Sequence, residues 1–256
     1  MYSVEGRRII VTGGAMGIGL SAMRALVAEG AHVVVMDVED ATTVVTTATA
    51  QGPGKAWFVH GDVSVRSDVE SAFATANEIM GGIDGLLNAA GIEDHYAPED
   101  ITDEVWDRMM AVNVTGTYLT NTVVFPYLKE RGGRIVNFGS DAGLINYVEA
   151  AHYSASKGAV MAWTRSVAGA WGKYGITVNS MVPAVWTPMY DRHRAYYNAE
   201  ELAAHDAMMA GVVPIGGKLG DPDRDLAPML VFMLSDASRF ISAQIISVNG
   251  GVNGTR

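Results

Sequence analysis

The sequence predicts an α/β fold in which helices cover both faces of a doubly wound parallel sheet. Seven short runs are apolar throughout rather than alternating apolar with polar residues, as strands buried on both faces must be. Segments of helical periodicity separate these runs, so strand and helix alternate along the whole chain. Residues 1–256 contain no Pro/Gly/Ser linker, charge run or internal repeat, which predicts a single domain.

The candidate strands are bounded by Gly, Asp or Asn, which favour turns. In order they are RIIVT (8–12), HVVVMD (32–37), AWFVHGD (56–62), GLLNAAG (85–91), RIVNFGS (134–140), ITVNSMV (176–182) and IISVNGG (245–251).

Helical segments are expected over residues 17–30, 65–80, 102–130 and 152–172, and from about residue 222. Residues 183–221 interrupt the alternation with extra helical material, NAEELAAHDAMMAG. We therefore expect an inserted substrate lid at about 183–221 rather than a second domain, and we call these residues the lid segment.

Composition excludes several classes of function. The formal net charge of −10 and the pI near 5.0 argue against nucleic acid and anionic membranes as partners. There is no cysteine, and the six histidines form no pair at metal-ligand spacing on one element, so no metal is expected. No apolar run approaches ~18 residues and the N-terminus does not read as a signal peptide, which predicts a soluble cytoplasmic protein.

A glycine-rich turn follows the first candidate strand. In TGGAMGIGL, Gly13, Gly17 and Gly19 stand at the turn into the first helix, where a pyrophosphate approaches the backbone closely and a Cβ would obstruct it. Asp37 ends the second strand about 20 residues later, where a carboxylate binds the adenosine ribose hydroxyls. The same carboxylate would repel a 2′-phosphate, so NAD is predicted as the cofactor rather than NADP.

Tyr153 and Lys157 are four residues apart in a predicted helix and therefore face the same space. At ~4 Å and an effective dielectric near 20, the lysine would favour phenolate by up to ~4 kcal/mol. That would move the tyrosine pKa from ~10 towards ~7, where the phenol can exchange protons with an alcohol or a carbonyl. Ser140, at the end of the fifth strand, and Asn113, within the helical segment 102–130, are expected nearby.

Together, TGGAMGIG, Asp37, NAAG at 88–91 and YSASK resemble the single-domain short-chain dehydrogenase/reductase family, with further matches at Asp62–Val63, Asn113 and Ser140. The resemblance covers essentially the whole chain. It implies a Rossmann-like, seven-stranded parallel sheet and transfer of a hydride between NAD and a secondary alcohol or ketone. It also suggests a homotetramer packed through the helices at about 102–130 and 152–172.

The resemblance implies a role for each matching residue. Tyr153 would be the catalytic acid/base, Ser140 would hold the substrate oxygen, Lys157 would also bind the nicotinamide ribose, and Asn113 would hold a water of a proton relay. The residues implied to bind cofactor, besides Tyr153 and Lys157, are Gly13, Gly17, Ile18, Gly19, Asp37, Asp62, Val63, Asn88, Ala89, Gly91, Val185 and Thr187.

Two regions depart from the family pattern. In PAVWTPM, Ala184 replaces the usual glycine and Thr187 arrives one residue early, which bears on how the nicotinamide is anchored. Near the C-terminus, Asn249 stands where an aspartate is common.

The lid segment and the loop after the fourth strand bear on the substrate. Large adaptable side chains in and near the lid segment favour an apolar cyclic, terpenoid, steroid or aryl substrate, although such side chains are also common in cores and subunit contacts. Glu93 and Asp94 would repel an anionic substrate, while His95 and Tyr96 either line the mouth or form an exposed loop without function.

Two alternatives remain open at this point. The chain could be a non-catalytic NAD-binding sensor or scaffold, but such a protein has no physical need of the catalytic set. It could also be an acyl-chain 3-ketoreductase acting on carrier-bound substrates. Asp37 and the acidic balance of the chain count against that reading.

Overall fold

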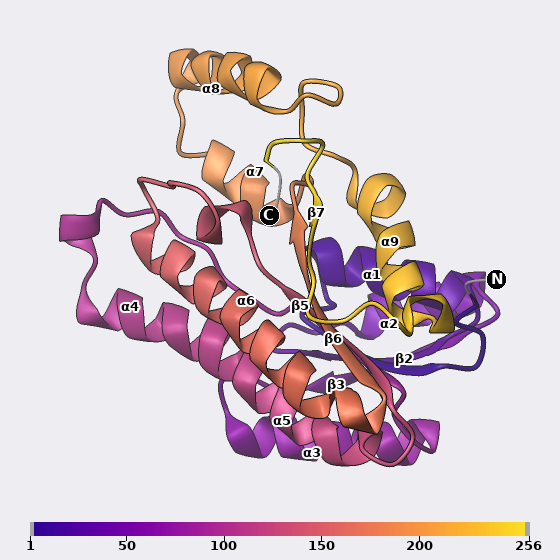
Figure 1. Ribbon diagram of the computed structural model, residues 1–256. Coiled ribbons are helices and arrows are strands. Elements are labelled where there is room, and N and C mark those ends of the chain that lie inside the picture. Colours follow the sequence, from indigo (N-terminus) through magenta and orange to yellow (C-terminus); the bar gives the residue numbers. More distant parts are fainter. Residues whose placement is uncertain (1–2, 254–256) are drawn as a thin grey trace.

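The computed structural model describes residues 3–253, which form one seven-stranded sheet in which every strand pairing is parallel (Figure 1). The strand order is β3-β2-β1-β4-β5-β6-β7, so the order reverses between β1 and β4. The strands are β1 (Arg8–Thr12), β2 (His32–Asp37), β3 (Lys55–His60), β4 (Gly85–Asn88), β5 (Gly133–Phe138), β6 (Ile176–Pro183) and β7 (Ile245–Val248). All seven predicted strands are confirmed.

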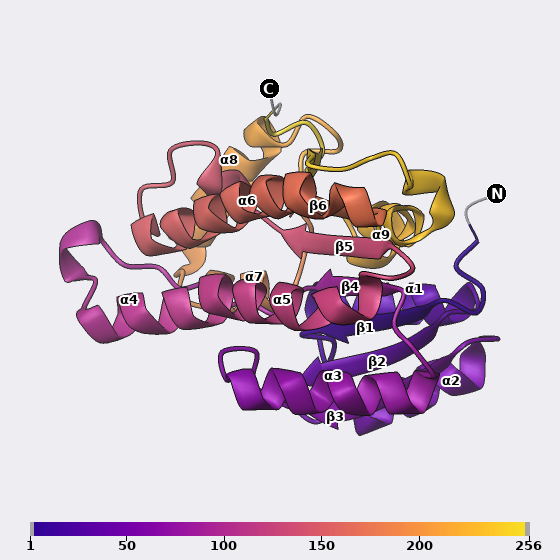
Figure 2. The same ribbon diagram turned by 60° about the horizontal axis from the view of Figure 1, so that its bottom comes forward.

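Helices cover both faces of the sheet, as the two views show (Figures 1 and 2). In chain order they are α1 (Gly17–Ala28), α2 (Thr42–Gln51), α3 (Arg66–Met80), α4 (Asp103–Met110), α5 (Gly116–Leu128), α6 (Ala151–Trp171), α7 (Pro188–Arg194), α8 (Ala199–Val212) and α9 (Ala227–Leu234).

Alternate residues of the inner strands enter two different cores. Ile9 and Val11 of β1 pack with α1 and α9 on one face, while Ile10 between them packs with α3, α5 and α6 on the other. Successive strand side chains point to opposite faces, so a sheet covered on both sides needs apolar residues at every position. This is why the strands are continuous apolar runs in the sequence.

The predicted helix over 102–130 is a single helical path with an irregular centre. Thr102 caps its start by accepting a hydrogen bond from the Val105 N–H. Between α4 and α5, residues Ala111–Thr115 form one π-helical turn, which contains Asn113. Such turns insert one extra residue into a helix and re-aim the side chains there, which accounts for an asparagine in the interior of a long helix.

The lid segment contains α7 and α8, and α8 buries none of its side chains within the chain. In Figure 1, α8 lies apart from the sheet, with α7 between it and the strands. A capping box begins α8, since the Asn198 side chain accepts from the Glu201 N–H and the Glu201 carboxylate accepts from the Asn198 N–H. Across residues 3–253, no helix has the length and apolarity that crossing a bilayer requires.

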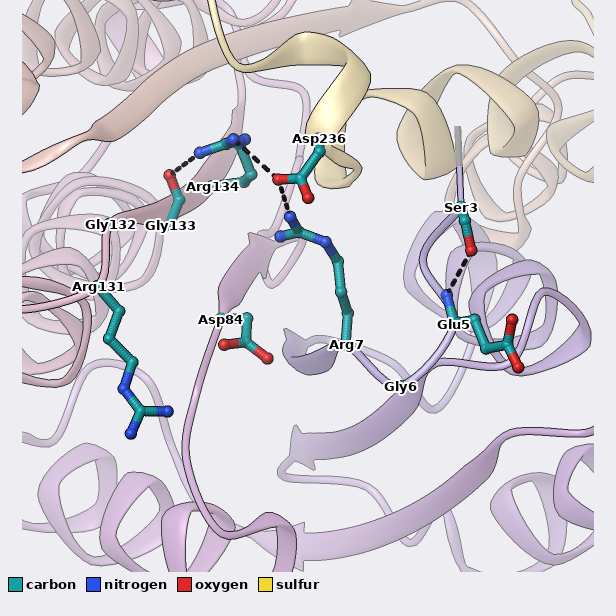
Figure 3. Close-up of a pocket in the computed structure, with 10 residues that line it drawn as sticks. All are labelled: Ser3, Glu5, Gly6, Arg7, Asp84, Arg131, Gly132, Gly133, Arg134 and Asp236. Carbon is teal, nitrogen blue, oxygen red and sulfur yellow. Dashed lines mark hydrogen bonds and ion pairs between the residues drawn. The ribbon is translucent and has the colours of Figure 1, made fainter. Parts of the chain in front are cut away.

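A pocket of about 420 Å³ opens at the amino ends of β1, β4 and β5 (Figure 3). Arg7 and Arg134 both donate to Asp236 there, and Arg134 also donates to the Gly133 carbonyl. Burial and the neighbouring charge of Arg7 lower the pKa of Arg134. These contacts hold the amino ends of the strands in place. The residues predicted to be functional lie at the other, carboxyl ends of the strands.

Candidate active site

A hydrogen bond between side chains joins the carboxyl ends of β1 and β4. The sequence predicts Asn88 as a site residue but not its partners. The Thr12 hydroxyl donates to Asn88 Oδ1 at 2.9 Å and accepts from the Ala90 N–H at 3.2 Å. Asn88 Nδ2 donates to Thr117 Oγ1 at 3.1 Å. These buried bonds fix the backbone of the Asn88–Gly91 turn, and they engage the side-chain oxygen and one N–H of the Asn88 amide.

Glycine is required at the three predicted loop positions for two different reasons. A Cβ on Gly13 would lie 2.6 Å from the Ala90 Cα, and one on Gly19 would lie 2.1 Å from the Gly13 carbonyl oxygen. Both positions therefore need glycine because the backbone folds tightly on itself. Gly17 has φ +57°, and the nearest atom to its Cβ would be Pro188 Cδ at 3.7 Å.

Gly17, rather than Gly13 or Gly19, therefore leaves open space at the start of α1. The first N–H groups of a helix have no partner within the helix and carry the positive end of its dipole. An open, left-handed glycine at that point fits a pyrophosphate. Ile18 follows Gly17 in the first turn of α1 and is half-buried.

Asp37 lies beside this loop, at the end of β2. Its Oδ2 accepts from the Ala15 N–H at 2.9 Å, and its Oδ1 accepts from the Glu39 N–H at 3.0 Å. The carboxylate is thus oriented at the edge of the loop by backbone donors, the arrangement expected for a group that binds ribose hydroxyls.

Asp62 and Val63 follow β3 in the next loop. Asp62 Oδ1 accepts from both the N–H and the hydroxyl of Ser64, at 2.8 and 2.7 Å. Val63 is buried, and a Cβ on Gly116 would lie 2.9 Å from its Cγ2. Val63 therefore packs directly on the start of α5, which fixes where the loop after β3 lies.

Tyr153 and Ser140 meet at the carboxyl end of β5. The Ser140 side chain acts on the Tyr153 hydroxyl as a hydrogen-bonding partner that favours its ionised form. Ser140 precedes a short turn, Asp141–Gly143, and its hydroxyl also accepts from the Ala142 N–H at 3.2 Å. Tyr153 projects from the first turn of α6, so the sheet and the helix each supply one hydroxyl to the same point.

Lys157 and Asn113 lie beside this pair. Lys157 Nζ donates to the Phe138 carbonyl at 3.1 Å, and Asn113 exchanges two hydrogen bonds of 2.9 Å with the Ile92 backbone. A Cβ on Gly91 would lie 3.2 Å from Asn113 Oδ1 and 3.5 Å from Lys157 Nζ. Glycine at 91 thus leaves room between the amide and the ammonium group.

The prediction that the pKa of Tyr153 falls below its ordinary value is wrong for the protein without its cofactor. Burial, and then the charge of Glu93, raise the pKa of Tyr153 above its ordinary value, and the hydrogen bond with Ser140 only partly lowers it. The reason is geometric: Lys157 Nζ lies 5.6 Å from the centroid of the Tyr153 ring and donates to a carbonyl. Burial also lowers the pKa of Lys157 to about 8.

Val185 and Thr187 lie where β6 runs into the lid segment. Val185 is buried and bridges to Gly220, and the Trp186 N–H donates to the Gly220 carbonyl at 2.8 Å. The Thr187 hydroxyl caps α7 by accepting from the Tyr190 N–H at 3.3 Å. Pro188 follows and approaches Gly17, so the start of α7 lies beside the open part of the glycine loop.

Three histidines gather where the lid segment meets the loop after β4: His95 comes from that loop, and His193 and His205 come from the lid segment. The rings of His95 and His193 have centroids 3.9 Å apart. His193 is hydrogen-bonded to the Tyr197 hydroxyl at 2.6 Å, and His205 to the Tyr190 hydroxyl at 2.7 Å. Among the described residues, no group of three or more His, Asp or Glu is arranged to hold a metal ion.

Sequence reasoning mentioned Glu93 only for its effect on substrates and left Tyr147 out. Both influence the pKa of Tyr153, and Glu93 also opposes the fall in the pKa of Lys157. Glu93 Oε1 lies 3.4 Å from His95 Nε2. Its position five residues after Asn88 was the available signal, because loops at the carboxyl edge of a parallel sheet converge on one site.

Comparison with known proteins agrees with this arrangement. A family model described as short chain dehydrogenase matches residues 7–197. The chain is 34% identical to 2-(S)-hydroxypropyl-CoM dehydrogenase 3 of Xanthobacter autotrophicus, over 95% of each chain. It is 35% identical to 2,5-dichloro-2,5-cyclohexadiene-1,4-diol dehydrogenase of Sphingobium indicum, over 98% of each.

Among solved structures, levodione reductase superposes with a TM-score of 0.90 at 27% identity, over 96% of this chain and 97% of that one. The agreement extends along nearly the whole of both chains.

Proposed function

The chain belongs to the short-chain dehydrogenase family and is an oxidoreductase acting on CH–OH groups, and from this premise we propose that it uses NAD to oxidise a neutral secondary alcohol or to reduce the matching ketone. One observation carries the proposal: the Ser140 side chain acts on the Tyr153 hydroxyl and favours its ionised form, and both lie beside Lys157 at the carboxyl edge of the sheet. An open glycine turn, Gly17, stands at the same edge.

In this mechanism Tyr153 exchanges the proton of the substrate hydroxyl. During oxidation its phenolate accepts that proton, and during reduction its phenol returns it to the carbonyl oxygen. Ser140 donates a hydrogen bond to the same oxygen and fixes its distance from Tyr153. When bound, NAD supplies the hydride acceptor and, in its oxidised form, a positive charge near Tyr153.

Lys157 and Asn113 support the proton transfer. The ammonium group would bind the nicotinamide ribose, and it places a positive charge 5.6 Å from the centre of the Tyr153 ring. Asn113 would hold a water that connects Lys157 with solvent. Its side-chain amide is engaged with Ile92, Met109 and Ser156, so its part in such a relay rests with the backbone of its π-helical turn.

The proposed cofactor contacts follow from the loops at this edge. Gly17 and Ile18 would receive the pyrophosphate, with Gly13 and Gly19 shaping the turn, and Asp37 would bind the adenosine ribose. The orientation of the Asp37 carboxylate by the Ala15 N–H supports NAD over NADP, because a 2′-phosphate would meet like charge. Asp62 and Val63 would bind adenine, the backbone of Asn88, Ala89 and Gly91 would flank the ribose, and Val185 and Thr187 would hold the nicotinamide amide.

For the substrate, we propose an apolar cyclic, terpenoid, steroid or aryl compound without negative charge. Tyr147 lies near Tyr153 and, through the rings of His95 and His193 that pack on it in turn, supplies aromatic surface there, while Glu93 disfavours anions. One relative is named for a cyclohexadienediol, which is a cyclic alcohol. We also propose that the lid segment closes over this substrate.

For the assembly, we propose a cytoplasmic homotetramer. Trp106 on α4 and Tyr118 on α5 are large side chains left exposed in the single chain. Light scattering after size-exclusion chromatography tests this directly, since a monomeric mass would refute it.

A substrate screen tests the function. We expect purified protein to produce NADH from NAD with one or more cyclic, terpenoid, steroid or aryl secondary alcohols, and to prefer NAD to NADP. NAD binding without turnover over the whole panel would instead favour a sensor or scaffold, and a preference for NADPH with acyl-chain ketones would favour a carrier-dependent ketoreductase.

A further inference from the structure

The carboxylate next to the proposed substrate-binding serine is held by the C-terminal part of the chain. Asn249 Nδ2 donates to both oxygens of Asp141, at 3.1 and 3.2 Å, and Asn253 Nδ2 donates to Asp141 Oδ1 at 2.7 Å. Asn249 is only 4% exposed, and its own Oδ1 accepts from the Gly251 N–H at 3.1 Å. Two asparagines thus surround one half-buried carboxylate.

The same C-terminal turn is fixed to the end of the lid segment. Gly250 and Gly251 have φ values of +65° and +88°, which only glycine adopts readily. The Ile215 N–H donates to the Gly250 carbonyl at 3.0 Å, and a Cβ on Gly250 would lie 2.8 Å from Val213 Cγ1. One rigid turn therefore contacts the end of the lid segment on one side and Asp141 on the other.

Asp141 in turn belongs to the short turn that aims Ser140. Within this turn the Gly143 N–H donates to the Ser140 carbonyl at 3.0 Å, and the Ala142 N–H donates to the Ser140 hydroxyl. Asp141 adjoins Ser140 in the chain, so a displaced carboxylate would turn the serine hydroxyl away from Tyr153. Charge-assisted hydrogen bonds like those on Asp141 are stronger than neutral ones and more directional.

This arrangement explains the asparagine at 249. A carboxylate at 249 would stand within hydrogen-bond distance of a second carboxylate, and two like charges at that separation cannot both ionise readily. Burial already raises the pKa of Asp141, and its asparagine partners partly oppose this. The site holds one charge, at 141, and needs a donor at 249.

We propose that Asn249 and Asn253 are positioning residues that, through Asp141, hold the Ser140 hydroxyl in register with Tyr153 and connect that serine to the end of the lid segment. The role assigned to Ser140 rests on the proposed function. The hydrogen bonds of Asp141 with Asn249 and Asn253 are seen in the structure whatever the function is.

The decisive experiment exchanges the charge between the two positions. Asn249→Asp is nearly isosteric but adds the second carboxylate, Asp141→Asn removes the first, and Asp141→Asn combined with Asn249→Asp restores one carboxylate and one amide. Asn253→Ala removes a single donor and guards against misfolding of the charged variant. Gln51→Glu, at an exposed position on α2, adds the same charge far from the site as a control.

Turnover is measured with NAD and the member of a cyclohexanol series that the wild-type protein oxidises fastest. For Asn249→Asp we expect kcat to fall by about tenfold or more, the loss expected for a charge-assisted hydrogen bond. The Kd for NAD should stay within about threefold, because the cofactor loop is not touched. The exchanged double variant should recover to within about threefold of wild type, and Gln51→Glu should match wild type.

A pH profile separates positioning from general loss of structure. The charged or titratable groups around Tyr153 are Glu93, Tyr147, Asp141 and Lys157. If Asn249→Asp adds charge at Asp141, the pH at which oxidation begins should rise, and the exchanged variant should return it to the wild-type pH. Equal kcat and an unchanged profile in Asn249→Asp would overturn the proposal, as would a double variant no more active than Asn249→Asp.

Hydrogen exchange of residues 139–146 provides a readout without turnover. We expect faster exchange in Asn249→Asp and Asn253→Ala, and wild-type exchange in the double variant. If the wild-type protein oxidises no alcohol but these exchange rates change as expected, the proposed function fails while the positioning contacts stand. Unchanged exchange in all variants of an active enzyme would overturn the positioning contacts alone.

Discussion

The buried ammonium group of Lys157 should lower the free energy of unfolding of the protein, and this effect can be measured. The side chain is 8% exposed, and burial lowers its pKa from 10.5 to about 8. At ~1.4 kcal/mol per pKa unit, keeping this ammonium group buried costs roughly 3 kcal/mol of folding free energy at pH 7. Hydrogen bonding to the Phe138 carbonyl keeps the group in place but does not remove the cost.

The sign of the pH dependence follows from proton binding. Between pH 8 and 10.5 the unfolded chain keeps its proton on Lys157 more firmly than the folded chain does. The unfolded state therefore binds more protons in that window, and the contribution of Lys157 to stability rises with pH. Below pH 8 both states are protonated, so the cost is complete and constant.

Lys157→Met keeps the aliphatic chain and removes the charge. The free energy of unfolding, from urea titrations at pH 7 to 10.5 and one protein concentration, should rise with pH less steeply in the variant than in wild type. The slope is diagnostic, because the unpaired Phe138 carbonyl lowers the stability of Lys157→Met equally at every pH. Lys55→Met, at an exposed position, should follow the wild-type curve. Parallel curves for Lys157→Met and wild type would refute this reasoning.

Four further substitutions give separate expectations. Gly17→Ala should raise the Kd for NAD by about tenfold or more in a fluorescence titration. Its loss of stability should be only about 1 kcal/mol, because the space at Gly17 is open and only the left-handed φ of +57° strains an alanine there. Gly13→Ala should lower the unfolding free energy by about 2 kcal/mol or more in urea, because its Cβ would overlap backbone. A larger loss of stability for Gly17→Ala than for Gly13→Ala would contradict the roles assigned to the two glycines. Asp37→Asn should shift the ratio of kcat/KM values for NADP and NAD by about tenfold or more towards NADP, and an unchanged ratio would show that Asp37 does not select the cofactor. Glu93→Gln should move the acidic limb of alcohol oxidation to lower pH, because the Glu93 charge raises the pKa of Tyr153; a shift to higher pH would contradict that sign.

Most of the fold could be predicted from the sequence, because local signals and global packing agree in it. A parallel sheet covered on both faces requires uninterrupted apolar strands, and each such run is a strand of the structure. The π-helical turn at Asn113 could not be predicted, since it depends on the bonds that the Asn113 side chain makes with Ile92. Helical periodicity alone places this asparagine in an ordinary helix.

At the site, the residue types could be predicted but their electrostatics could not. The spacing of Tyr153 and Lys157 indicates a shared face, but it does not reveal that Lys157 donates to the Phe138 carbonyl or that burial dominates both pKa values. The pairing of Asp141 with Asn249 joins residues 108 positions apart and depends on how β5 and β7 end at the same edge of the sheet.

Replacing Tyr153 with phenylalanine tests the central claim most directly, because only one oxygen is removed. With NAD and the best alcohol from the screen, the account predicts that Tyr153→Phe loses at least about a thousandfold in kcat while the Kd for NAD stays close to the wild-type value. A variant that oxidises the alcohol at the wild-type rate would show that the proton leaves the substrate by another route, and the proposed chemistry would be wrong.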